Sequence, residues 1–432
     1  MKVSVNTQKI VGKIKPMNAV NNGPIYTKNS DQNLTNLLAY KEAAIPFSRT
    51  HDASICYDYG GEHTVDILGI FPDFDADPYS PDSYDFTLTD MYLDNIMLSG
   101  AQVFYRLGNK IEHWPKHYGI FPPKDFKKWA VICEHIIRHT NEGWANGHQR
   151  GIKFWEIWNE PDFNGKCWAG TREEFFDLFE TTAKHLKACF PDLKIGGPAV
   201  CSSNPDWLVP FFEAMSKRNV PMDFYSWHHY SANVQDFRSD MRLHRAYLDK
   251  YGYTDCESIL NEWNYVCGWG GEEWKQSLAT EVSTKGAAFI AAVMTAGQQE
   301  RLDMLMYYDA RTNSSMNGLF RFGTLEPLKG YYPIKVWGEM LKSDGECETR
   351  CDVPDIYAVS AVKDGKSITM LTYYTDSKSP LPRTFKVELD GDVLRTIYLL
   401  DDDHDMTACE TVAPDNGSFS LTMKPNTVVV IK

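Results

Sequence analysis

The chain has 432 residues, of which 43% are hydrophobic and 24% are charged, a balance typical of folded globular proteins rather than of disordered ones. Asp and Glu total 58 against 44 Lys and Arg, so the formal charge at pH 7 is −14. This excess of negative charge argues against nucleic acid and anionic membranes as partners, because both require a positively charged protein surface.

The cysteines and the N-terminal residues bear on the cellular compartment. Ten Cys are scattered along the chain, and with no C-x-x-C pair they indicate neither a zinc ribbon nor a redox motif. The first residues include lysines but no apolar run of the kind found in signal peptides. The longest apolar stretch, Gly286 to Gly297, is too short to span a bilayer. We therefore expect a cytoplasmic protein.

Short apolar runs typical of β-strands alternate with helical patterns over most of the chain. In chain order, the eight predicted strands are Lys13–Ala19, Ile45–Thr50, Ala101–Gly108, Ile152–Asn159, Leu193–Val200, Met222–Tyr230, Ser258–Asn264 and Leu302–Tyr308. The clearest helix covers Arg172–Cys189, where Thr171 and Glu174 have the spacing of a capping box. Further helices are predicted after Asn204 and over Thr280–Ala296 and Tyr332–Leu341. Eight such units predict a (β/α)₈ TIM barrel over residues 1–343, an α/β fold with its active site at the carboxyl ends of the strands.

The pattern changes after about Ser343, where strands follow one another without helices. The predicted strands are Ile356–Val362, Ser367–Tyr374, Phe385–Leu389, Thr396–Leu400, Phe419–Met423 and Val428–Ile431. Asp364-Gly365 and Asp390-Gly391 are typical of hairpin turns between such strands. Residues 344–432 are therefore predicted to form a C-terminal all-β sandwich domain, to which Val3–Val5 could add an edge strand.

Two of the predicted barrel strands run into a glutamate. Glu160 follows the fourth strand and precedes Pro161, which ends strand pairing there, and Glu262 lies in the seventh strand. The two are 102 residues apart, the length of three β-then-α units, so they face each other across the barrel mouth. A pair of carboxylates at about 5 Å is what retaining glycoside hydrolysis requires. The alternative is that each is a hydrogen-bonded polar residue at a strand end.

The sequences around these glutamates resemble a known family. Trp158-Asn159-Glu160-Pro161 and Leu260-Asn261-Glu262-Trp263-Asn264 resemble glycoside hydrolase clan A, most closely family 39, the β-xylosidase and α-L-iduronidase group. Arg49-Thr50-His51 and the segment Asp223–Tyr230 match further motifs of that family in order. The resemblance implies a retaining glycoside hydrolase with a two-carboxylate double-displacement mechanism, β-xylosidase-like activity on oligosaccharides or glycosides, and no cofactor.

The resemblance also implies roles for individual residues. Glu160 is the expected general acid/base and Glu262 the expected nucleophile, while Asn159 would bind the sugar 2-hydroxyl. Arg49 and Tyr230 would hold Glu262 in its ionised form. His51 and His228 are also expected to contact the sugar as hydrogen-bond donors.

The eighth strand departs from the clan, which commonly places a tryptophan at its end. Here the strand ends Tyr308-Asp309-Ala310-Arg311, so Tyr308 is the expected sugar platform and Asp309 the expected partner of a sugar hydroxyl. Arg311 raises the alternative of an acidic sugar. Trp168, in the loop after the fourth strand, is either a second platform or a packing residue.

Different interpretations of single residues and of the whole chain stay open at this point. Glu156 is predicted to pair inside the barrel with an arginine such as Arg106. The adjacent His228 and His229 could suggest a metal-dependent barrel hydrolase, but further ligands at suitable spacing are missing from the sequence and no metal is predicted. The sequence is also compatible with a family 39-like activity on a different or acidic sugar, and with a catalytically silent carbohydrate-binding barrel. Oligomer formation is left open.

Overall fold

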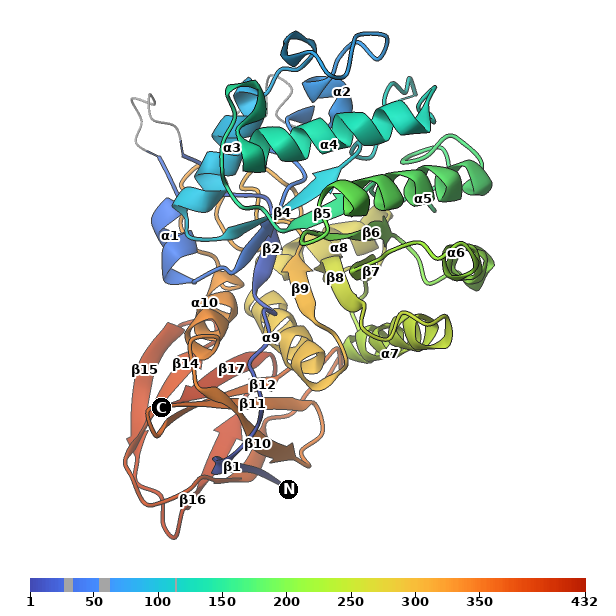
Figure 1. Ribbon diagram of the computed structural model, residues 1–432. Helices are drawn as coiled ribbons and strands as arrows, with labels where there is room; N and C mark the ends of the chain where they lie inside the picture. Colours follow the sequence, from blue (N-terminus) through green and yellow to red (C-terminus); the bar gives the residue numbers. More distant parts are fainter. Residues whose placement is uncertain (27–33, 54–62, 113–114) are drawn as a thin grey trace.

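The computed structural model describes residues 1–26, 34–53, 63–112 and 115–432, and it contains a closed barrel and a nine-stranded sheet (Figure 1). Every neighbouring pair of barrel strands is parallel, in the order of the chain. These strands are β2 (Ala19–Asn21), β3 (Phe47–Arg49), β4 (Gln102–Leu107), β5 (Phe154–Ile157), β6 (Lys194–Val200), β7 (Phe224–Tyr230), β8 (Glu257–Asn264) and β9 (Met304–Tyr307). The predicted TIM barrel is confirmed.

The first barrel strand begins later than predicted. The segment expected to form it, Lys13–Ala19, contributes only its last residue, and β2 continues to Asn21. Lys15 explains the difference, because its ammonium donates to the carbonyl oxygens of Gly297 (3.0 Å), Glu300 (2.7 Å) and Leu302 (2.9 Å). The segment thus satisfies carbonyl groups at the end of a helix instead of pairing in the barrel.

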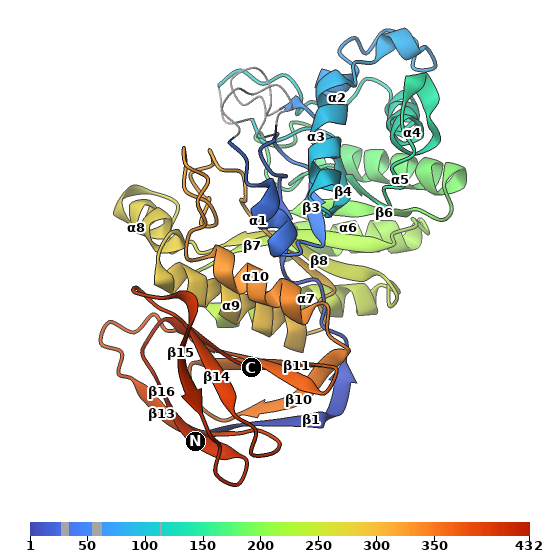
Figure 2. The same cartoon turned by 90° about the vertical axis from the view of Figure 1, so that its left-hand side faces the viewer.

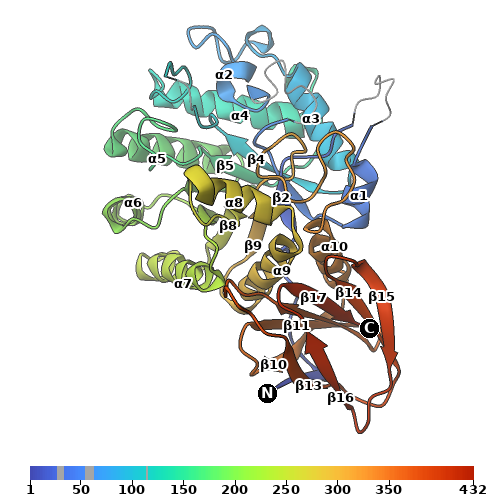
Figure 3. The ribbon, with the colours of Figure 1, turned by 180° about the vertical axis from the view of Figure 1, so that it is seen from behind.

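Helices surround the barrel on its outer side (Figures 1 and 3). They are α1 (Leu37–Glu42), α2 (Ile67–Ile70), α3 (Thr87–Leu98), α4 (Phe126–Glu142), α5 (Arg172–Cys189), α6 (Pro205–Lys217), α7 (Val234–Lys250), α8 (Gly271–Glu281), α9 (Thr284–Gln299) and α10 (Tyr331–Met340). The helix α5 has its predicted bounds and its capping box. The predicted helix Thr280–Ala296 is instead divided between α8 and α9, because the Ser283 side chain caps a new helix by accepting from the Gly286 N–H at 3.3 Å.

The barrel interior is apolar at its amino-terminal end. Side chains at the starts of the strands pack against one another there, and three of the rings have centroids 5.1 to 5.7 Å apart. The cluster consists of Ala19, Phe47, Phe104, Phe154, Phe224, Ile259, Met304 and Met306. Because side chains alternate along a strand, the residue two positions further on also points inward, and this places Arg49, Glu156 and Asn261 one layer nearer the carboxyl end.

The nine-stranded sheet folds over a second apolar core, as expected for a sandwich. Its strands are β1 (Lys2–Gly12), β10 (Gly345–Cys351), β11 (Ile356–Lys363), β12 (Lys366–Tyr373), β13 (Arg383–Glu388), β14 (Arg395–Leu400), β15 (Asp405–Val412), β16 (Ser418–Met423) and β17 (Thr427–Ile431), and their order is β15-β14-β17-β12-β11-β10-β1-β13-β16. The sequence did not predict β10 and β15, since both are largely polar and lack the alternation of a half-buried strand. Helices α9 and α10 lie between this sheet and the barrel strands (Figure 2).

Two predictions about this sheet are wrong. The N-terminal strand β1 is not at an edge, because it pairs with β10 on one side and with β13 on the other. Asp390-Gly391 does not join two paired strands, because β13 pairs with β1 and β16 whereas β14 pairs with β15 and β17. The other turn is confirmed: Asp364 and Gly365 have φ values of 50° and 74° and connect the paired strands β11 and β12.

Within the described ranges, none of the helices combines the length and the apolar character that a bilayer crossing requires.

The last residue of α8 is a buried acid. Glu281 is 1% exposed, and neither carboxyl oxygen has a hydrogen-bond partner among the described residues. Burial raises the pKa of this carboxyl to about 9, so the folded protein holds it neutral at pH 7 whereas the unfolded chain ionises it. Stability from this group is therefore complete below about pH 4.5 and is lost as the pH rises through 9.

We expect Glu281→Gln to reduce this dependence on pH. The melting temperature of the wild type should fall by several degrees between pH 5 and pH 8.5, and that of the variant should fall by less, because the amide does not ionise. Thermal denaturation followed by circular dichroism at both pH values measures the difference. Glu272→Gln, in the exposed first turn of the same helix, is the matched control and should behave like the wild type. Parallel pH profiles for Glu281→Gln and the wild type would contradict the assignment.

Candidate active site

Arg49 lies at the centre of the polar layer inside the barrel. Its Nε donates to Glu156 Oε2 at 2.7 Å, its Nη1 to Glu262 Oε1 at 2.6 Å and its Nη2 to Asn159 Oδ1 at 2.7 Å. Burial by itself would lower the pKa of Arg49, but the two carboxylates raise it, so the guanidinium stays charged. The planar fork of arginine can make these three contacts at once, which a lysine cannot.

Glu156 pairs with an arginine, as predicted, but this arginine is Arg49 and not Arg106. Glu156 pairs with Arg49 and also accepts a hydrogen bond from Asn261. Arg106, the predicted partner, donates instead to Asp66 at 2.6 Å. Asp66 is the residue immediately before α2, and the next N–H along the chain, that of Ile67, donates to the carbonyl oxygen of Gly108 just after β4 at 3.0 Å. Asp66 is therefore close to the end of the strand that carries Arg106.

The carboxylate of Glu262 receives hydrogen bonds on both oxygens. Arg49 occupies Oε1, and the Tyr230 hydroxyl donates to Oε2 at 3.0 Å. Burial and the nearby carboxylate of Glu262 raise the pKa of Tyr230, so this hydroxyl remains a donor. His51 lies close as well, with Nε2 at 3.6 Å from Oε1. The residues predicted from the second, sixth and seventh strand motifs therefore meet at one carboxylate.

Glu160 projects into the mouth from a strained turn after β5. Trp158 and Glu160 have φ values of 74° and 48°, a region that residues other than glycine rarely adopt. The Glu160 N–H is anchored on the carbonyl oxygen of Ala199 at 2.9 Å. Its side chain contacts His228 Nδ1 at 2.7 Å through Oε1, and the Cys167 thiol donates to Oε2 at 3.5 Å.

His228 lies between the two glutamates. Its Nδ1 is 2.7 Å from Glu160 Oε1 and 3.4 Å from Glu262 Oε2. One carboxylate oxygen from each glutamate and a ring nitrogen of His228 all lie within 4.8 Å of one another. Burial lowers the pKa of His228 to about 4, with a smaller opposing effect of Glu262, so the ring is neutral near pH 6. Two carboxylates and an imidazole are also suitable ligand types for a divalent cation, but the Arg49 guanidinium already provides positive charge at Glu262.

The eighth-strand residues lie beside this pair. Tyr308 is half-buried and meets His51 and Tyr230 edge to face, with ring centroids 5.6 and 6.5 Å apart. Asp309 is fully buried and accepts from Asn22 Nδ2 at 2.7 Å and from the Arg311 N–H at 2.8 Å, so one oxygen holds the loop in place. The Arg311 side chain is paired with Asp52, with Nη1 at 3.0 Å from Oδ2.

Trp168 does not reach the mouth. It is 1% exposed, its Nε1–H donates to the carbonyl oxygen of Thr171 at 2.8 Å, and its ring packs at right angles to Trp158. The packing interpretation of this residue is therefore the one that fits, and Trp168 is not available as a sugar platform.

The sequence did not single out three residues of this site. Asn21, in β2, donates to the carbonyl oxygen of Asn261 at 2.7 Å and accepts from Arg49 at 3.1 Å. The predicted first strand ended at Ala19, so Asn21 was not recognised as a residue at the carboxyl end of a barrel strand. Cys167 and Asp52 were overlooked because a single thiol or acid outside a motif has no sequence signal; their role comes from their positions beside Glu160 and Arg311.

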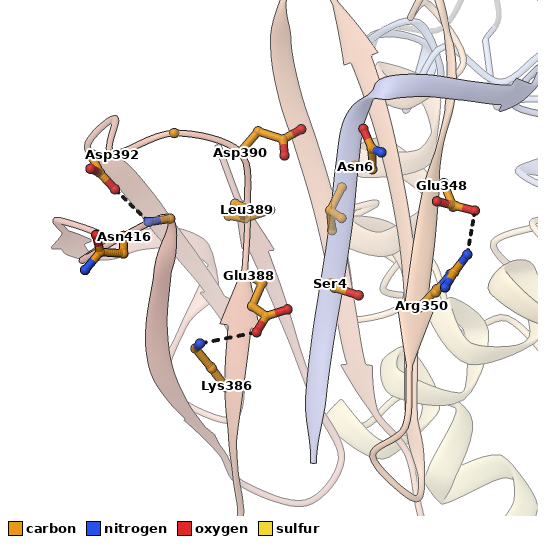
Figure 4. Close-up of a pocket in the computed structure, with 13 residues that line it drawn as sticks. Ser4, Asn6, Glu348, Arg350, Lys386, Glu388, Leu389, Asp390, Asp392 and Asn416 are labelled. Carbon is orange, nitrogen blue, oxygen red and sulfur yellow. Dashed lines mark hydrogen bonds and ion pairs between the residues drawn. The ribbon is translucent and has the colours of Figure 1, made fainter.

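A separate cavity of about 650 Å³ lies on the nine-stranded sheet (Figure 4). Four of its charged side chains form ion pairs, Lys386 with Glu388 and Arg350 with Glu348, and its two aspartates, Asp390 and Asp392, accept hydrogen bonds from Thr7 and from the Gly417 N–H. The residues that line it include no aromatic ring and no residue of the barrel. The pair of glutamates at the barrel mouth is thus the better candidate for an active site.

A closed parallel barrel with two facing glutamates at its mouth defines the class of barrel glycoside hydrolases. The model of Glycosyl hydrolases family 39 matches residues 1–304, and the chain belongs to that family. The expected family is therefore confirmed.

Two curated relatives are β-xylosidases. The chain is 29% identical to that of Geobacillus stearothermophilus over 179 residues, which are 39% of this chain and 35% of the relative. It is 31% identical to that of Caldicellulosiruptor saccharolyticus over 160 residues, 35% of this chain and 32% of the relative. The matches thus span about a third of the curated relatives.

Solved structures share the whole fold. The glucosidase of Croceicoccus marinus has a TM-score of 0.79 at 22% identity, covering 100% of this chain and 98% of that one. A monomeric β-xylosidase of Caulobacter crescentus has a TM-score of 0.72 at 16% identity, with the same coverage of both chains. At these identities the likeness concerns the fold alone.

Proposed function

We propose that this protein is a retaining glycoside hydrolase, with β-xylosidase-like activity as its leading function, Glu262 as nucleophile and Glu160 as general acid/base. The observation that carries the proposal is the spacing of the pair, whose carboxylate oxygens approach within 4.8 Å. Retaining enzymes hold these groups about 5 to 5.5 Å apart, whereas inverting enzymes need about 6.5 to 9.5 Å to admit a water molecule.

The contacts of each glutamate suit its proposed role. Arg49 and Tyr230 stabilise negative charge on Glu262, so it can attack the anomeric carbon. Glu160 donates its proton to the departing oxygen in this first step. When Glu262 has become an ester, its negative charge is gone, and Glu160 can then carry a negative charge and take a proton from the attacking water. The neutral His228 ring can donate its Nδ1 hydrogen to Glu160 in that ionised state.

The surroundings of Arg311 favour a neutral sugar. An arginine that recognised a sugar carboxylate would need unpaired charge, but Arg311 is 17% exposed at its side chain and already paired with Asp52. The Arg311 Nε also lies 3.6 Å from Oδ2 of the fully buried Asp309, so a second carboxylate offsets its charge. Tyr308 offers a half-buried aromatic ring beside His51. These features, with the names of the curated relatives, support a neutral pentoside or hexoside, and we propose a β-xyloside as the preferred substrate.

A panel of p-nitrophenyl glycosides tests the proposal. We expect release of p-nitrophenol from the β-xyloside at a higher kcat/KM than from the glucoside, arabinofuranoside or iduronide. Proton NMR of the first product formed should show the anomeric configuration of the substrate, as double displacement requires. No turnover on the whole panel would favour a carbohydrate-binding barrel, and an inverted first product would contradict the roles assigned to the two glutamates.

A further inference from the structure

Trp269 exposes an unusually large apolar surface. It lies in the loop between β8 and α8 and is 63% exposed, whereas every other tryptophan in the described ranges is buried or half-buried. An indole ring that stays in water does not contribute the free energy of folding that its burial would provide, which is among the largest of any side chain. An exposed ring of this size therefore indicates a ligand or partner that covers it.

The ring is held in a fixed position. It stacks on Trp274 in the first turns of α8, with centroids 5.4 Å apart and planes 22° from parallel. Its other neighbour is Tyr230, at 5.1 Å and 76°. Since Tyr230 donates to Glu262, only one aromatic ring separates Trp269 from the proposed nucleophile. A pre-positioned aromatic face binds a ligand with little loss of conformational freedom.

The position of Trp269 relative to the glutamates indicates which part of a substrate it meets. The reacting sugar must contact Glu160 and Glu262, which are only 8% and 5% exposed, so that ring lies deep in the mouth. Trp269 is 63% exposed whereas its neighbour Tyr230 is half-buried, so the indole ring is nearer to solvent than the groups that contact the reacting sugar. A leaving group must depart toward solvent, and the C–H face of a sugar ring is apolar enough to stack on an indole.

We infer that Trp269 is the platform of a second sugar-binding subsite, which holds the ring on the leaving-group side of the cleaved bond. The substrate then has at least two rings, and Trp269 contributes to the preference for an oligosaccharide over a simple glycoside. The inference rests on the proposed function, because it places the reacting ring between Glu160 and Glu262.

The test compares two substrates that differ only in the leaving group. Xylobiose fills the second subsite, whereas xylosyl fluoride leaves it empty; the same pair of any other sugar that the panel selects serves equally. Trp269→Ala should lower kcat/KM for the disaccharide about tenfold, the order expected for a lost stacking contact, and leave that for the fluoride within about twofold. Trp269→Phe should retain most of the activity on both.

A transfer assay provides a second readout that a purely structural defect would not change. With the glycosyl fluoride as donor, added free sugar must bind the second subsite to be glycosylated, so Trp269→Ala should lower the ratio of transfer to hydrolysis. Tyr79→Ala is the matched control, because Tyr79 is 64% exposed but packs against His135 on α4. Equal effects of Trp269→Ala on both substrates, or none on either, would overturn the inference. Wild-type protein that cleaves neither substrate would overturn the proposed function itself.

Discussion

Replacement of Glu262 by alanine is expected to abolish hydrolysis, with kcat lowered by about 10⁴-fold or more, because no group remains to form the glycosyl-enzyme. The fold should survive. Arg49 keeps its contacts with Glu156 and Asn159, so its charge is not left unpaired in the barrel. Steady-state kinetics on the preferred aryl glycoside measure the loss, and circular dichroism checks that the variant is folded.

Azide distinguishes a lost nucleophile from general damage. The truncated side chain leaves space beside the Arg49 guanidinium, where a small anion is attracted and can attack in place of the carboxylate. Turnover of Glu262→Ala should therefore rise with azide concentration and give a glycosyl azide of inverted configuration. Glu326→Ala, an exposed acid in the loop before α10, should keep wild-type activity and gain nothing from azide. High residual activity of Glu262→Ala without azide would exclude Glu262 as nucleophile.

Replacement of Glu160 by alanine is expected to depend on the leaving group. A sugar alkoxide needs a proton as the bond breaks, whereas a dinitrophenolate departs unaided. Hydrolysis of the oligosaccharide should fall by about 10²- to 10⁴-fold, while glycosylation by the dinitrophenyl glycoside should remain near the wild-type rate. Pre-steady-state kinetics should show a burst of dinitrophenol, since the variant forms the glycosyl-enzyme but lacks the base that activates water.

The pH profile provides an independent check on Glu160. In the wild type the basic limb of kcat/KM reports deprotonation of the general acid, so this limb should disappear in Glu160→Ala. The variant keeps Cys167 and His228, two side chains that contact Glu160. A basic limb that persists in the variant would therefore come from an acid other than Glu160. Equal losses on both substrates together with an intact basic limb would show that Glu160 is structural.

Strand runs and motif spacing were sufficient to predict the barrel and its two glutamates. Apart from β2, every barrel strand coincides with a predicted run to within a few residues, because a parallel strand buried on both faces is an almost continuous apolar segment. Glu160 and Glu262 could be located because each interrupts such a segment at its carboxyl end. The contacts of Arg49 and Tyr230 with Glu262 also agree with the roles that the resemblance implied. His51, which was expected to contact the sugar, lies beside the same carboxylate.

Contacts between distant segments were decided only by the tertiary structure. The sequence suggested Arg106 as the partner of Glu156, but Asp66, from another segment, accepts a hydrogen bond from Arg106, and Glu156 pairs with Arg49 instead. Similarly, β1 lies inside the sheet because β10 and β13 each pair with another strand on one side only and with β1 on the other. Burial of Trp168 and exposure of Trp269 have the same origin. Both are tryptophans in loops after barrel strands, and a local sequence cannot specify which of them the remainder of the chain will cover.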